Sequence, residues 1–207
     1  MRLALMASGT GSNLEILLSE KQAGNLPFVD WILLGCDRPN APVIQKAKSH
    51  RLKTWVHSPS EFADKNQYEK SLHQVLSEEE VDGIVLAGYM RLIGPTLLEH
   101  WEGRIINLHP SLLPSFPGQH SIRDALEHRV KLTGCTVHFV DEGLDTGPII
   151  AQESVPVFST DTPETLAKRI HQAEHSLLPK TVRRWSEGGF CLKNKIVHFV
   201  DEVGATI

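Results

Sequence analysis

Residues 103–114, GRIINLHPSLLP, decide the fold of this chain and carry its most informative polar side chains. The first half predicts a short, fully buried strand, because its apolar residues leave no polar face. Asn107 and His109 lie two positions apart, and on a strand that spacing puts both side chains on the same side. The prolines that follow end the strand, since proline lacks the backbone N–H that a ladder needs. An amide and an imidazole therefore project together from the carboxyl end of a buried strand, where they either bind a ligand or satisfy a buried turn.

The segments around this strand alternate between strand and helix patterns. Apolar strands are predicted at residues 3–7, 29–36, 53–57 and 81–87, and helices at 14–18, 42–50 and 60–76, the last capped by Ser60. Further helices are predicted at 95–101, 121–128 and 162–185, strands at 134–140 and 149–157, and a hairpin within 190–207. This order predicts an α/β fold: a Rossmann-like, mostly parallel twisted sheet flanked by helices, with the C-terminal strands extending the sheet.

Length, composition and charge limit the classes of protein that fit this chain. Its 207 residues suit a single domain spanning 1–207. The formal net charge of −4 argues against a nucleic-acid partner, and no apolar run approaches the roughly 18 residues of a membrane span. The three cysteines are widely spaced, and the N-terminus lacks the pattern of a signal peptide. We therefore expect a cytoplasmic protein that acts on small molecules, with no nucleic-acid or membrane partner.

A glycine-rich turn follows the first predicted strand. Gly11, Ser12 and Asn13 come directly before a helical pattern, so backbone amides and hydroxyls gather at a helix N-terminus. Such a turn binds anions such as phosphate, although a tight strand-to-helix turn uses the same residues without a ligand. It lacks the lysine of a P-loop and the third glycine of a dinucleotide fingerprint.

Two clusters contain the residue types that bind metals. His171, Glu174 and His175 share one face of the last predicted helix, but a metal there would need a further ligand. Three acidic residues lie within 141–145, between two predicted strands, and they suit a divalent-cation loop but lack the EF-hand spacing. We expect no metal at either cluster.

Residues 107–114, NLHPSLLP, together with the Gly-Ser-Asn turn, resemble the folate-dependent formyltransferases over about residues 1–190. The resemblance implies transfer of the formyl group of 10-formyltetrahydrofolate to the amine of glycinamide ribonucleotide, in purine synthesis, without a metal. The alternative is a formyltetrahydrofolate hydrolase or another folate-dependent formyltransferase. The hydrolase usually carries an N-terminal regulatory domain and methionyl-tRNA formyltransferase a C-terminal RNA-binding domain, and we expect neither here.

The resemblance implies three catalytic residues. Asn107 would donate a hydrogen bond to the formyl oxygen as that oxygen becomes negative. His109 would donate to the same oxygen or move protons. Asp145 would place its carboxylate against the histidine, where it favours the charged imidazolium.

The resemblance also implies two sets of binding residues. Those expected to hold glycinamide ribonucleotide are Gly11, Ser12 and Asn13 at its phosphate and Glu174, with a weaker contact from His171, at its ribose. Those expected to hold the folate are Met90, Arg91, Leu92, Ile93 and Asn107, with Lys65 near its tail. Behind the reacting groups the resemblance implies a buried histidine, His120, and Thr136.

The resemblance implies two functional halves of the chain, and three residues depart from it. A phosphate-binding half is expected at about 1–100 and a folate-binding and catalytic half at about 101–190. Gln119, Ile122 and Thr146 depart from the residues common in the family, so the detail of their loops stays open. We expect a monomer or a homodimer.

Overall fold

The computed structural model describes residues 1–200 of the chain, which folds into two compact units. The first unit is Met1–Ile106, and the second begins at Asn107. The division therefore falls within the strand that was predicted to carry the amide and the imidazole. The single-domain organisation and the functional halves stay predictions. Across the described residues, no helix has the length and apolar character needed to cross a membrane.

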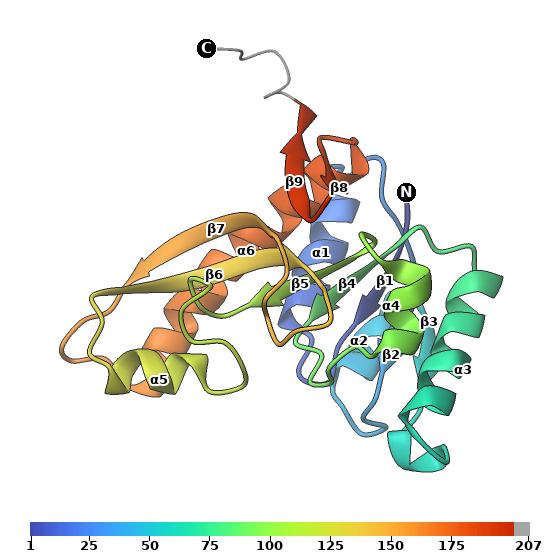
Figure 1. The fold of residues 1–207 in the computed structure, drawn as a ribbon, viewed down its shortest axis with the longest axis horizontal. Coiled ribbons are helices and arrows are strands. Elements are labelled where there is room, and N and C mark those ends of the chain that lie inside the picture. The colour runs from blue at the N-terminus through green and yellow to red at the C-terminus, as the bar shows by residue number, and fades with distance from the viewer. Residues whose placement is uncertain (201–207) are drawn as a thin grey trace. The chain divides into compact units, whose positions relative to one another are not determined.

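The first unit alternates parallel strands with helices. Its strands are β1 (Arg2–Met6), β2 (Asp30–Cys36), β3 (Lys53–Val56) and β4 (Gly83–Ala87). Its α-helices are α1 (Ser12–Gln22), α2 (Val43–Ser49), α3 (Lys65–Glu78) and α4 (Pro95–Trp101). β1 pairs in parallel with β2 on one side and β4 on the other, while β2 also pairs with β3 (Figure 1). The predicted alternation is confirmed in this unit.

α3 begins later than the sequence predicted. Ser60 was expected to cap a helix running through residue 76, but Ser58 caps a single 3₁₀ turn, Pro59–Glu61, through a capping box with Glu61. The chain is extended at Phe62, and α3 begins only at Lys65. Its N-cap is Asp64, whose carboxylate accepts a hydrogen bond from the Gln67 amide at 2.8 Å. Two successive caps therefore divide a segment whose apolar pattern alone suggested one helix.

The second unit contains the antiparallel part of the fold. β5 (Ile105–His109) crosses the division between the units, and within the second unit lie β6 (Leu132–Phe139), β7 (Ile149–Pro156), α5 (Ser121–Glu127) and α6 (Pro163–Ser186). β6 and β7 pair antiparallel. The hydrogen-bonded order β3-β2-β1-β4-β5-β6-β7 confirms a mostly parallel sheet that the C-terminal strands extend. The fold class predicted from the sequence is thus confirmed.

The second unit ends in a long helix and a hairpin. α6 begins after Thr162, which forms a capping box with Thr165, and it packs against β6 and β7 (Figure 1). β8 (Phe190–Lys193) and β9 (Ile196–Phe199) form the predicted antiparallel hairpin. The last seven residues of the predicted hairpin segment lie outside the described residues.

Candidate active site

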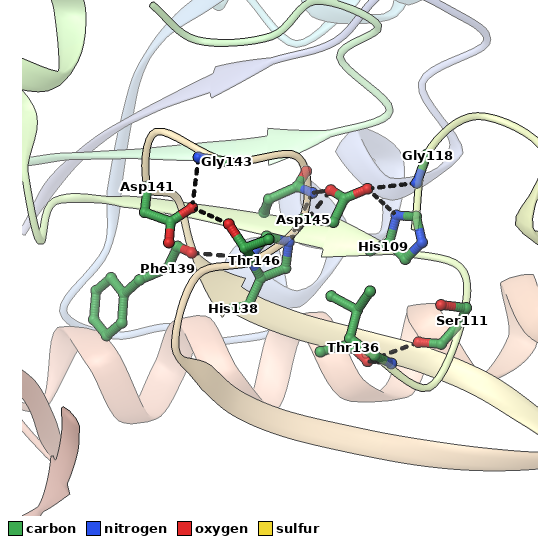
Figure 2. Close-up of polar contacts among 12 residues, drawn as sticks. His109, Ser111, Gly118, Thr136, His138, Phe139, Asp141, Gly143, Asp145 and Thr146 are labelled. Carbon is green, nitrogen blue, oxygen red and sulfur yellow. Dashed lines mark hydrogen bonds and ion pairs between the residues drawn. The ribbon is translucent and has the colours of Figure 1, made fainter. Parts of the chain in front are cut away.

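His109 ends β5 and makes two polar contacts. Its Nδ1 lies 3.3 Å from the Asp145 Oδ2 atom, and its Nε2 lies 2.9 Å from the carbonyl oxygen of Phe116 (Figure 2). The imidazole is only 4% exposed, so bulk water does not compete for either contact. The predicted pairing of this histidine with a carboxylate is therefore present in the structure.

The two partners of His109 constrain its protons. A carbonyl oxygen only accepts hydrogen bonds, so Nε2 must carry a hydrogen. Nδ1 then faces a carboxylate, which accepts a hydrogen bond from the charged imidazolium but repels the lone pair of the neutral ring. A ring that carries a hydrogen on each nitrogen can donate in both contacts, which places a group able to give up a proton at the end of β5.

Asp145 is held in place by contacts within its own loop and by the segment that follows β5. Its backbone is left-handed, with φ of 54°, a conformation that aspartate tolerates better than most residues. The Gly118 amide donates to its Oδ2 at 2.8 Å. Asp141 closes the loop by accepting hydrogen bonds from the Gly143 amide at 3.1 Å and the Thr146 hydroxyl at 2.7 Å (Figure 2). Thr146, which departs from the family pattern, thus helps to fix the loop that carries the carboxylate.

Asn107 reaches the same carboxylate from β5. Its Nδ2 lies 3.1 Å from Nε2 of His138 and 3.5 Å from Oδ1 of Asp145. Nδ1 of His138 lies 2.8 Å from the carbonyl oxygen of Phe139. Burial lowers the pKa of His138, so the neutral ring donates from Nδ1 and accepts at Nε2. Because Nε2 of His138 accepts, one hydrogen of the Asn107 amide points to His138. The other hydrogen has only the longer contact with Asp145, so it can turn to a different acceptor.

His138 was missed by the sequence reasoning. It is 2% exposed and lies 3.7 Å from Asp145, so it belongs to the same cluster as the three predicted catalytic residues (Figure 2). The available signal was its spacing from Thr136, because two residues apart on a strand means one shared face. The strand predicted over 134–140 is confirmed as β6.

Thr136 lies beneath the segment that follows β5. It is fully buried, and its hydroxyl donates to the carbonyl oxygen of Ser111 at 2.7 Å (Figure 2). The hydroxyl oxygen of Thr136 also accepts from the Leu113 amide at 3.1 Å and from the side-chain amide of Gln152 at 3.0 Å. One side chain on β6 therefore fixes the path of the chain as it leaves His109.

The expectation of a buried histidine at position 120 is wrong. His120 is exposed and precedes α5, and its side chain does not cap that helix. Gln119 beside it is also exposed, whereas Ile122 is half-buried on the helix. The second buried histidine beside the Asp145 carboxylate, after His109, is His138, which comes from β6.

Glu174 and His171 form a pair on α6. The His171 Nδ1 atom lies 2.8 Å from the Glu174 Oε2 atom, and the glutamate is 4% exposed. The hydrogen bond to Glu174 raises the pKa of His171, whereas burial lowers the pKa of His175. Within residues 1–200, no three His, Cys, Asp or Glu side chains are grouped as metal ligands, so the helix cluster and the acidic loop gain no support as metal sites.

We expect Glu174→Gln to lower the pKa of His171, because the amide no longer stabilises the imidazolium. The pair stabilises the fold fully below about pH 6.5, the pKa of histidine in an unfolded chain, and this stability is lost as the pH rises through the higher folded-state pKa. His171 is half-exposed, so screening keeps the contribution below about 1 kcal/mol. Nitrogen NMR titration of His171 measures the change, and an unaltered pKa in the variant would contradict it.

The remaining predicted residues lie in the first unit. Gly11 precedes α1 in a left-handed conformation with φ of 76°, and a Cβ there would lie 2.4 Å from a methyl carbon of Val43. Residues 11–13 therefore present the N-terminal amides of α1 at the carboxyl end of β1. Residues 90–93 follow the carboxyl end of β4, and Lys65 on α3 lies 3.7 Å from the buried carboxylate of Glu69.

Comparisons with known proteins show what the chain is similar to. A family model described as formyl transferase matches residues 1–182. The phosphoribosylglycinamide formyltransferase of Bacillus subtilis (strain 168) is 43% identical over 183 residues, which cover 88% of this chain and 93% of that protein. The trifunctional purine biosynthetic protein adenosine-3 of Drosophila melanogaster is 41% identical over 182 residues, which are 87% of this chain and 14% of that protein.

Solved structures give the same result. The crystal structure of phosphoribosylglycinamide formyltransferase from Bacillus halodurans has a TM-score of 0.87 and 48% identity, and the match covers 89% of this chain and 95% of that one. The crystal structure of glycinamide ribonucleotide transformylase 1 from Symbiobacterium toebii has a TM-score of 0.93 and 38% identity, and the match covers 97% of this chain and 94% of that one. These proteins share the fold of the chain along nearly its whole length.

Proposed function

We propose, from the premise that this chain belongs to the formyl transferase family, that it transfers the formyl group of 10-formyltetrahydrofolate to the amine of glycinamide ribonucleotide. The products are formylglycinamide ribonucleotide and tetrahydrofolate, and the reaction is a step of purine biosynthesis. The observation that carries the proposal is the cluster of buried His109 with half-buried Asn107 and Asp145, in which the loop after β6 brings Asp145 to the end of β5.

The reaction has a simple balance of bonds. The amine nitrogen bonds to the formyl carbon, the bond from that carbon to the folate nitrogen breaks, and one proton passes from the amine to the folate nitrogen. The formyl oxygen becomes negative in between. The transition state therefore needs a hydrogen-bond donor at this oxygen and a group that can take up and release a proton.

Asn107 and His109 can meet the first of these needs. The second hydrogen of the Asn107 amide has only the 3.5 Å contact with Asp145, so a negative oxygen can take it over at small cost. When it carries both hydrogens, His109 supplies a positive charge from a residue that is only 4% exposed, where charge–charge attraction is stronger than in water.

Asp145 supports the proton transfer. Its Oδ2 accepts from Gly118 and faces His109, while its Oδ1 faces Asn107 and His138. The carboxylate can thereby accept a hydrogen bond from the His109 ring and hold the ring beside the Asn107 amide. Both reacting molecules must still be positioned, and positioning of this kind contributes several kcal/mol to catalysis.

The proposal assigns the binding residues by their chemistry. The free amides at the N-terminus of α1, residues 11–13, suit the phosphate of glycinamide ribonucleotide. Glu174 is buried, and a carboxylate can accept hydrogen bonds from both ribose hydroxyls, with His171 as a neighbouring contact. The folate is assigned to residues 90–93, whose Met90 and Leu92 side chains are 48% and 59% exposed, with Lys65 near its tail.

Three features of the proposal remain predictions. The enzyme is predicted to work in the cytoplasm on small molecules alone, to be a monomer or a homodimer, and to need no metal. The hydrolase and the other folate-dependent formyltransferases are the alternatives, and the relatives named above favour neither.

We expect 10-formyltetrahydrofolate to be consumed only when glycinamide ribonucleotide is present, because the acceptor amine and not water attacks the formyl carbon. Folate absorbance with and without acceptor, combined with mass spectrometry of the product, gives the rate and the stoichiometry. One formylated nucleotide per folate released is the expected result. Equal rates without the acceptor, with release of formate, would identify a hydrolase.

The same assay tests the phosphate site. Gly11 is unsuitable for substitution because its Cβ would strike Val43 and destabilise the fold. Ser12→Asp is the better change, since aspartate suits a helix N-terminus but its charge repels a phosphate. We expect the KM for the acceptor to rise at least about tenfold, which corresponds to about 1.4 kcal/mol of repulsion. Ser12→Asn, uncharged and of the same shape, is the matched control.

A further inference from the structure

The first unit has a topological switch point between β1 and β4. The chain runs from β1 outward to β2 and β3, then returns to β4 on the opposite side of β1 (Figure 1). Ligands of open α/β sheets bind outside the carboxyl ends of the strands at such a point. The two loops that flank it are residues 7–11 after β1 and residues 88–94 after β4.

Ser8 joins these two loops through its backbone and its side chain. Its amide donates to the carbonyl oxygen of Gly88 at 3.0 Å. Its hydroxyl oxygen accepts from the Met90 amide at 2.9 Å and donates its hydrogen to the Asp37 carboxylate at 2.5 Å. Ser8 is 2% exposed and Asp37 is 7% exposed, so water does not replace these contacts. Because the hydrogen of the Ser8 hydroxyl goes to Asp37, the lone pairs of the Ser8 hydroxyl oxygen are directed toward the loop after β4.

Each loop is also anchored away from Ser8. The first loop continues to Gly9, whose carbonyl oxygen accepts from the Val43 amide at 3.2 Å, and then to the start of α1. The far end of the second loop is held by Glu69, whose Oε1 accepts from the Gly94 amide at 2.6 Å. The Tyr89 hydroxyl contacts that of Tyr68 at 2.9 Å. With the outer ends fixed, a displacement of either loop is transmitted to the Ser8 contacts.

We infer that Ser8 is a positioning residue that couples the binding of the two substrates. The inference rests on the proposed function, which assigns residues 11–13 to the phosphate of the acceptor and residues 90–93 to the folate. A ligand that orders one loop fixes the Ser8 hydroxyl and thereby orders the other loop in advance. Binding of the second ligand then costs less ordering, and by linkage the effect is equal in both directions.

Calorimetry with an unreactive pair of ligands tests this inference. Tetrahydrofolate carries no formyl group, so it and glycinamide ribonucleotide can occupy the enzyme together without reaction. In the wild-type protein we expect saturating tetrahydrofolate to lower the Kd of glycinamide ribonucleotide at least about fivefold. In Ser8→Ala this ratio should fall below about twofold. Ser49→Ala, which loses an exposed hydroxyl that donates within the last turn of α2, should keep the wild-type ratio.

A purely structural role for Ser8 would lower the melting temperature and weaken both ligands, but it would leave the ratio of the two Kd values unchanged. If Ser8→Ala does not fold, Asp37→Asn and Asp37→Leu provide the test. The asparagine oxygen still accepts from the Ser8 hydroxyl and should keep the coupling, whereas leucine should reduce it. Wild-type coupling in Ser8→Ala or Asp37→Leu would overturn the inference. So would a wild-type Kd for glycinamide ribonucleotide that is the same with and without tetrahydrofolate. Failure of the wild type to bind either ligand would instead overturn the proposed function.

Discussion

Replacing His109 by alanine should reduce turnover by about 10²- to 10⁴-fold, the range expected for losing one acid–base group. The variant loses the imidazole that faces Asp145 and with it the group that, in the proposed function, donates to the formyl oxygen. Binding of glycinamide ribonucleotide through its phosphate should survive, because residues 11–13 are untouched. Steady-state kinetics give the turnover, and calorimetry gives the binding of the acceptor.

The controls for this change separate chemistry from folding. His109 also contacts the carbonyl oxygen of Phe116, so thermal unfolding of the variant must show that the fold is retained. His50→Ala removes an exposed imidazole whose contact is with the Gln22 side chain, and it should retain wild-type turnover. Near-normal turnover in a folded His109→Ala protein would remove this histidine from the mechanism.

Replacing Asn107 by alanine should reduce turnover by about 10²- to 10³-fold, the range for losing one oxyanion-hole donor. The loss should appear mainly in kcat, since the hydrogen bond to the formyl oxygen strengthens as that oxygen becomes negative. Separate measurement of kcat and KM for both substrates tests this split. A rise in KM with unchanged kcat would show that the amide binds the folate and does not stabilise the transition state.

Three further variants test the role and the orientation of the Asn107 amide. His138→Phe removes the acceptor that fixes one amide hydrogen, so it should lower kcat by less than Asn107→Ala does. Combined with Asn107→Ala it should cost little more, because the two residues act as one unit. Asn107→Asp keeps the shape but replaces the donor with a charge 3.5 Å from the Asp145 position, and it should be at least as impaired as the alanine variant. Fully additive losses for the first pair would contradict the orienting role of His138.

The spacing of apolar residues predicted most of the strands and helices. The strands and helices were predicted close to their observed positions, because a buried strand needs an apolar run and a packed helix needs an apolar face. The start of α3 was wrong because two caps, Ser58 and Asp64, interrupt a pattern that hydrophobic spacing treats as continuous. The side chains of Asn107 and His109 were also predicted to share one side of β5, and both face Asp145.

The sequence by itself therefore determined the order of the elements, the strand that ends in an amide and an imidazole, and, through a family motif, the carboxylate beside them. These features depend on neighbouring residues, whose spacing decides which face is buried. Only the tertiary structure decided that His138, and not His120, is the second buried histidine of the cluster, and that Thr146 donates to Asp141 and so helps to close the loop of Asp145. Asn107 and His138 are 31 residues apart, and Asn107 and Asp145 are 38 apart. Whether such distant side chains meet depends on the path of the chain through a helix, a strand and a loop, which local spacing does not encode.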